Sequence, residues 1–163
     1  MVTIGILADT HIASCSEIFS TQTRQAFSGC DVIIHAGDLT DQSILSAFEG
    51  KKVYAVHGNM CNHVTKLALP FEKKIEISGY SIGLCHGAGP VATIEDRMWN
   101  LFPDADCIIF GHTHTPVCEQ RGTVLFINPG SFRTTGPYGA PPTYAILVID
   151  DQGMQANIHT LAK

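Results

Sequence analysis

The chain has 163 residues, of which 45% are hydrophobic, so it is long and apolar enough to bury a core, and we expect one domain over residues 1–163. Its 10 Lys and Arg residues against 15 Asp and Glu residues give a formal charge of -5, which argues against general nucleic-acid binding and against a polybasic membrane patch. Six cysteines without a Cys-x-x-Cys pair, a first apolar run without a basic leader, and the lack of a membrane-spanning run predict a cytoplasmic protein with reduced thiols.

Strands and helices alternate in the front half of the chain. The predicted order is strand, helix, strand, helix and strand, over residues 2–8, 17–28, 31–36, 41–49 and 53–57. This order is typical of right-handed βαβ units, in which parallel strands bring their carboxyl ends to one edge of the sheet. We therefore expect that edge to collect the polar side chains that follow these three strands.

The back half is rich in hairpins. It is predicted to contain a hairpin over 73–77 and 80–84, a helix from Thr93 to about Leu101, a strand over 107–110, a hairpin over 116–119 and 123–127, and a final strand pair over 144–149 and 155–161. Residues 60–70, 87–92 and 131–142 are expected to be irregular loops. The predicted fold class is α/β, with two packed mixed β-sheets flanked by helices. The pattern leaves the oligomeric state open, and a homo-oligomer is compatible with it.

Five predicted strands end in polar groups. In chain order these groups are Asp9-x-His11, Gly37-Asp38, Gly58-Asn59, His86-Gly87 and Gly111-His112-x-His114. Each residue taken alone is better explained by a capped turn or a buried hydrogen-bonded group, whereas the whole set indicates a metal site. Mixed imidazole, carboxylate and amide ligands suit Mn, Fe, Zn or Ni, and are too rich in nitrogen for calcium.

The set resembles the signature of the calcineurin-like metallophosphoesterase superfamily, which runs D-x-H, G-D, G-N-H, H and G-H-x-H. The match spans residues 9–114 and depends on residue type, order and position after strands together. The short chain and the sequence Asn128-Pro129-Gly130-Ser131 are more similar to the small bacterial and archaeal phosphodiesterases of that superfamily, which share their fold with a retromer subunit.

The resemblance implies a site with two divalent transition metal ions, with manganese expected first and Fe, Zn or Ni as alternatives. It places Asp9, His11, Asp38 and His114 on one ion, and Asp38, Asn59, His86 and His112 on the other, so that Asp38 bridges the two. Two such ions bind a phosphoryl oxygen and a bridging hydroxide, which attacks phosphorus in line. The implied activity is hydrolysis of small phosphodiesters, with Asp38, Asn59 and His86 as catalytic residues.

The sequence departs from the family pattern directly after Asn59. Many relatives have histidine there as a proton donor or phosphate contact, whereas this chain has Met60, which has no proton to donate. Since a positioned acid accelerates a reaction about 10²- to 10⁴-fold, we expect a preference for substrates with good leaving groups. His63 is the nearest candidate to replace the missing acid, and this role is a hypothesis.

Several other residues, and the function itself, keep more than one interpretation. His35 and His57 lie on predicted buried strands and are expected to be core groups or groups that orient ligands. Ser131 or Arg133 either belongs to a simple turn or reaches a bound phosphate. The alternative to an enzyme is a non-catalytic metal-binding scaffold of the same fold that binds other proteins, and a third interpretation is a single structural zinc site.

Overall fold

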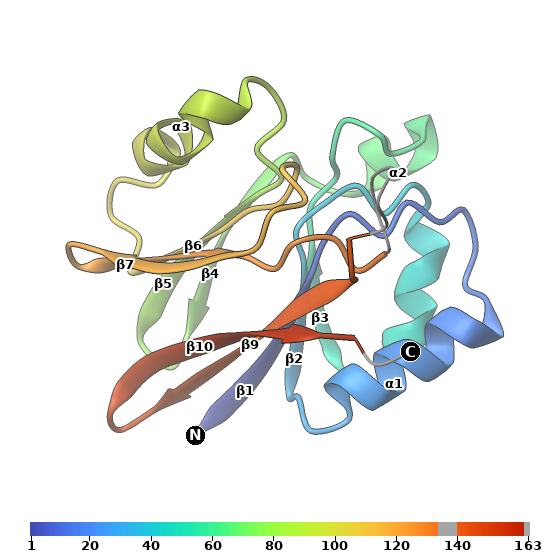
Figure 1. Cartoon of the computed structure of the whole chain (residues 1–163), viewed down its shortest axis with the longest axis horizontal. Helices are drawn as coiled ribbons and strands as arrows, with labels where there is room; N and C mark the ends of the chain where they lie inside the picture. Colours follow the sequence, from blue (N-terminus) through green and yellow to red (C-terminus); the bar gives the residue numbers. More distant parts are fainter. Residues whose placement is uncertain (134–139, 162–163) are drawn as a thin grey trace.

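The computed structural model describes residues 1–133 and 140–161, which form two five-stranded β-sheets packed face to face (Figure 1). Side chains from both sheets fill the space between them, including Ile4 and Ile34 from one sheet and Ile82 and Ile109 from the other, all fully buried. The predicted fold class, two mixed sheets with helices outside, is confirmed.

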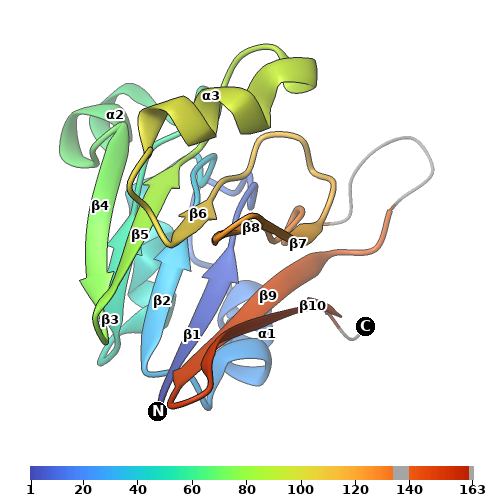
Figure 2. The same ribbon diagram turned by 90° about the vertical axis from the view of Figure 1, so that its left-hand side faces the viewer.

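The first sheet has the strand order β10-β9-β1-β2-β3. Its strands are β1 (Val2–Leu7), β2 (Val32–His35), β3 (Lys52–Ala55), β9 (Thr143–Asp150) and β10 (Gly153–Thr160). β1, β2 and β3 are parallel, as predicted from the alternation of strands and helices, whereas β9 and β10 add an antiparallel pair at the other side of β1. Figure 2 shows β1 and β2 running in the same direction, so that their carboxyl ends meet at one edge.

Two helical segments cover the outer face of this sheet. Helix α1 (Glu17–Phe27) begins at Ser16, whose hydroxyl accepts a hydrogen bond from Phe19 N at 3.1 Å. Its buried residues Phe19, Thr23 and Phe27 recur every four positions, which is the spacing of one helix face. The segment η1 (Gln42–Phe48) is a 3₁₀ helix, although residues 41–49 were expected to form an ordinary helix, because hydrogen bonds such as that of Ile44 N to Asp41 O span three residues.

The second sheet has the strand order β4-β5-β6-β8-β7. Its strands are β4 (Glu72–Ile77), β5 (Tyr80–Cys85), β6 (Cys107–Ile109), β7 (Val117–Arg121) and β8 (Val124–Asn128). The three central strands are parallel, and the two edges are the predicted hairpins. The short 3₁₀ segment η2 (Val91–Thr93) leads into α3 (Ile94–Leu101), which packs Ile94 and Met98 on the outer face of this sheet (Figure 1).

The expectation of a loop over 60–70 is wrong for part of that stretch, because helix α2 (His63–Ala68) lies within it. Asn62 caps this helix by accepting a hydrogen bond from Thr65 N at 2.8 Å. Only Thr65 is buried in this helix of six residues, and its apolar residues Val64 and Leu67 are exposed, so the helix does not pack an apolar face on the core. Across residues 1–133 and 140–161, none of the helices has both the length and the apolar character needed to cross a membrane.

Candidate metal centre

The turns that follow the strands hold several expected ligands in an unusual backbone conformation. Positive φ angles occur at Asp9 (53°), His11 (48°), Asp38 (53°), His112 (68°) and His114 (57°). Residues other than glycine rarely adopt this left-handed conformation, and each instance costs about 1–3 kcal/mol unless the surroundings enforce it. Strain of this kind clusters at functional sites, so its concentration at these positions points to the same place as the sequence motifs.

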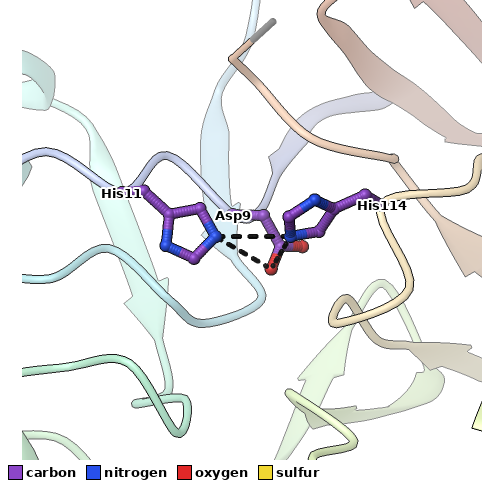
Figure 3. Close-up of side chains that lie close together, drawn as sticks. All are labelled: Asp9, His11 and His114. Atoms are coloured by element: carbon purple, nitrogen blue, oxygen red, sulfur yellow. Dashed lines mark hydrogen bonds and ion pairs between the residues drawn. The ribbon is translucent and has the colours of Figure 1, made fainter. Parts of the chain in front are cut away.

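The first group of candidate ligands consists of Asp9, His11 and His114 (Figure 3). Asp9 is fully buried, and its Oδ1 lies 3.2 Å from His114 Nε2 and 3.8 Å from His11 Nε2. The two imidazole nitrogens are 3.3 Å apart. The other carboxylate oxygen, Asp9 Oδ2, accepts a hydrogen bond from His112 N at 3.1 Å, which fixes the orientation of the carboxylate.

The second group consists of Asp9, Asp38 and His86. His86 Nε2 lies 3.1 Å from Asp38 Oδ2 and 3.9 Å from Asp9 Oδ1. His86 Nδ1 donates to Ala36 O at 2.8 Å, and Asp38 Oδ1 accepts from Met60 N at 2.7 Å. A hydrogen bond to the backbone therefore fixes the orientation of each side chain. Asp9 is shared by the two groups in this arrangement, and a bridging role for Asp38 stays a prediction.

The chemistry of these donors fits a cation. Among the described residues, Asp9 Oδ1 and His86 Nε2 are buried side-chain atoms without a hydrogen-bond partner, and such groups are costly to bury. They face one another together with an imidazole pair and a second carboxylate. A divalent cation in each of the two groups would satisfy these atoms, since imidazole nitrogen and carboxylate oxygen are common ligands of transition metals.

The charges of the site act on one another. Burial alone would raise the pKa of Asp38, but His86 and the Met60 amide outweigh it, so the pKa of Asp38 is lowered and the group is a carboxylate at neutral pH. Burial alone would lower the pKa of His86, but Asp38 and Asp9 outweigh it and raise that pKa. The Asp9 carboxylate, 3.2 Å from His114 Nε2, likewise raises the pKa of His114. Protons therefore compete with a cation for these imidazoles.

The last two expected ligands, His112 and Asn59, lie at the rim. The His112 ring stands against the His86 ring with centroids 5.3 Å apart, and its Nε2 donates to Gly89 O at 3.1 Å. Asn59 is exposed, and its backbone carbonyl accepts a hydrogen bond from Lys66 Nζ at 2.8 Å. Their roles as ligands stay predictions.

Two glycines leave room for the ligand side chains of neighbouring loops. A Cβ atom on Gly58 would lie 2.1 Å from Asp38 Oδ1 and 2.6 Å from Asp38 N. Gly37 has a φ of +93°, and a Cβ there would lie 2.6 Å from His86 Nδ1. The glycines of Gly37-Asp38 and Gly58-Asn59 are thus needed for close approach between neighbouring loops, which their position in a turn does not reveal.

Sequence reasoning missed the support that comes from the turn over 128–131. The buried Asn128 donates from Nδ2 to Gly111 O at 2.8 Å and accepts at Oδ1 from Gly130 N at 2.9 Å. The buried Ser131 donates to Asp9 O at 2.9 Å, so its hydroxyl holds the first ligand turn and is not free to reach a phosphate. Arg133 is exposed and donates to His11 O at 3.0 Å. The signal in the sequence was the Asn-Pro-Gly-Ser turn, but its partners are distant in the chain.

The remaining histidines lie outside the two groups. His35 is fully buried and, as expected, a core side chain, and burial lowers its pKa to about 3. His57 is half-buried, and its ring centroid lies 5.8 Å from that of Phe71. His63 is exposed at the start of α2. All six cysteines lie in the described ranges, and none of them forms a disulfide there.

Residues 2–152 match the sequence model of the calcineurin-like phosphoesterase superfamily domain. A probable metallophosphoesterase of Methanothermobacter thermautotrophicus is 34% identical over 158 residues, which cover 95% of this chain and 90% of the relative. A phosphodiesterase of Methanocaldococcus jannaschii is 28% identical over 162 residues, which cover 88% of this chain and 91% of the relative. The structure of Vacuolar Protein Sorting 29 from Cryptosporidium parvum, 19% identical, has the same fold, with a TM-score of 0.73 over 99% of this chain and 98% of that chain.

Proposed function

Because the chain belongs to the calcineurin-like phosphoesterase superfamily, we propose that it is a metal-dependent phosphodiesterase that hydrolyses small phosphodiesters with two divalent transition metal ions. The observation that carries the proposal is the pair of buried atoms without hydrogen-bond partners, Asp9 Oδ1 and His86 Nε2, 3.9 Å apart within a cluster of carboxylates and imidazoles. Relatives named phosphodiesterase support the same reaction class.

The proposed ligands divide between two ions as the family motif implies. Asp9, His11, Asp38 and His114 would hold one ion, and Asp38, Asn59, His86 and His112 the other. Divalent cations such as manganese supply Lewis acidity toward phosphoryl oxygens and lower the pKa of water at the site. The chain contributes orientation: Ala36 O holds His86 Nδ1, and Met60 N holds Asp38 Oδ1, so the opposite atoms of both side chains face the site.

The chain also shapes the substrate preference at the leaving-group side. The thioether of Met60 has no proton to donate, and only the backbone amide of this residue acts in the site, on Asp38. The enzyme should therefore act best on esters of acidic alcohols, whose oxygen leaves without protonation. His63 is the candidate to supply a proton, and a His63→Ala variant with an unchanged pH profile of kcat would rule it out.

The second candidate is a non-catalytic scaffold that binds other proteins. The observation in its favour is a set of exposed apolar side chains on and around α2, namely Met60, Val64, Leu67 and Phe71. In this alternative the metal centre is retained without turnover. A structural site with a single zinc ion is the third alternative, and it predicts one tightly held ion per chain.

The decisive experiment measures metal content and turnover on the same samples. Elemental analysis would give the ions per chain, and hydrolysis of bis(p-nitrophenyl) phosphate would be followed with and without added manganese. The enzyme proposal expects turnover that depends on metal and is lost in Asp38→Ala and His112→Ala. Matched controls are Asp151→Ala and His159→Ala, which remove an exposed carboxylate and an exposed imidazole from the β9–β10 hairpin. Metal binding without turnover would favour the scaffold, and one ion without turnover would favour structural zinc.

A further inference from the structure

A small cavity opens directly beside the proposed metal centre. It has a volume of about 220 Å³ and is lined mostly by apolar atoms, from His57, Gly58, Asn59, Lys66, Phe71, His86 and Ala88. Two of these residues, Asn59 and His86, are proposed ligands. Two larger hollows, of about 520 Å³ and 460 Å³, are lined by none of the seven proposed ligands, so the small cavity has the better position for part of the substrate.

The outer wall of this cavity is an exposed aromatic ring. Phe71 is 52% exposed, so part of its ring is accessible to a bound group. Its ring is tilted by 55° against the His57 ring at a centroid distance of 5.8 Å. His57 N donates to Pro70 O at 3.0 Å, so the backbones that carry the two rings are held together. The aromatic wall is therefore formed before any ligand arrives.

The mouth of the cavity carries a positive charge. Lys66 lines it and donates from Nζ to Asn59 O at 2.8 Å, which holds the ammonium group beside a proposed ligand. In a chain with a formal charge of -5, a cation at this place is suited to an anionic group that enters the site. The cavity thus combines an apolar body with a cationic edge next to the metal centre.

We propose that this cavity binds an aromatic substituent of the phosphodiester, with Phe71 and His57 against the ring and Lys66 near the phosphate. The proposal rests on the proposed function and specifies the substrate class as aryl or similarly flat apolar esters. The size agrees, because an apolar cavity of about 150 Å³ in another protein holds benzene. A cavity of about 220 Å³ therefore accepts one ring with a small substituent.

The test compares the binding of phenyl phosphate and methyl phosphate to the manganese-loaded protein by calorimetry. Aromatic contacts are worth about 0.5–1.5 kcal/mol, so the wild-type protein should bind phenyl phosphate about 2- to 10-fold more tightly. Phe71→Ala should abolish this preference, and Phe71→Tyr, which retains the ring, should keep it. Leu67→Ala is the matched control, because Leu67 is 75% exposed on α2 and does not line the cavity.

The outcomes separate this proposal from the proposed function. Equal binding of the two phosphates by the wild-type protein, or equal losses in Phe71→Ala and Leu67→Ala, would overturn the cavity proposal even if the protein hydrolyses phosphodiesters. A preference for phenyl phosphate that depends on Phe71 would support the cavity even if no turnover is found, and only the proposed function would then fail. No binding of either phosphate by the manganese-loaded protein would overturn the cavity proposal, whereas turnover of the phosphodiester would still decide the proposed function.

Discussion

His35 makes the stability of the protein depend on pH in a predictable way. It is fully buried, and its Nδ1 accepts a hydrogen bond from Gly37 N at 3.2 Å. The ring proton of the neutral form must then be on Nε2, which lies 3.2 Å from Thr10 Oγ1 and donates to it. Both nitrogens are used, so the folded protein holds the neutral imidazole, and burial lowers its pKa from 6.5 to about 3.

The size of the effect follows from linkage. Between pH 6.5 and 3 the unfolded chain binds a proton at His35 that the folded protein does not bind, so the free energy of unfolding falls as the pH is lowered. The stabilisation is fully present above pH 6.5 and is lost as the pH falls toward the pKa of the folded state. With about 1.4 kcal/mol for each pH unit, the loss attributable to His35 between pH 8 and pH 5 is about 2 kcal/mol.

Urea unfolding of the metal-free protein at pH 8 and at pH 5 measures this loss, in the wild-type protein and in His35→Asn. The amide oxygen of asparagine replaces Nδ1 as an acceptor but does not titrate. The wild-type protein should lose about 2 kcal/mol more than the variant, because the other titrating groups are common to both. Equal losses, or an NMR titration of His35 in the folded protein with a midpoint near 6.5, would refute the reasoning.

Three further results are expected. Manganese at about 100 times its Kd should stabilise the folded protein by about 2.7 kcal/mol and raise Tm by about 5–10 °C. EDTA should reverse this rise, and a Tm unaffected by manganese would contradict the metal centre. Gly58→Ala should lower metal affinity at least tenfold in calorimetry, since its Cβ would displace Asp38, whereas Gly29→Ala, which meets nothing within 4 Å, should have little effect. Asn128→Ala should cost about 1–3 kcal/mol in urea unfolding and weaken metal binding about 10- to 100-fold, and a loss as small as that of the exposed control Asn157→Ala would count against its supporting role.

The sequence by itself determined the order of the strands along the chain and the polar residues that follow them. Apolar runs that alternate with helical patterns predicted the parallel strands β1, β2 and β3. The polar groups after these strands, such as Asp9 and Asp38, predicted a site at the edge where the carboxyl ends of the strands meet. These signals are local, because a strand needs a few apolar residues and a ligand motif needs a few polar ones. The short helix α2 and the 3₁₀ helix η1 were missed or misread because six or seven residues carry too weak a period.

Only the tertiary structure decided how the ligand turns are held and which surface lies beside them. Ser131 binds Asp9 O across 122 positions of sequence, and Gly58 makes room for Asp38 from a neighbouring loop. The cavity at Phe71 likewise arises where α2 and the turns after β3 and β5 come together. Such contacts depend on how distant segments pack, and no spacing along the chain encodes a distance between two loops.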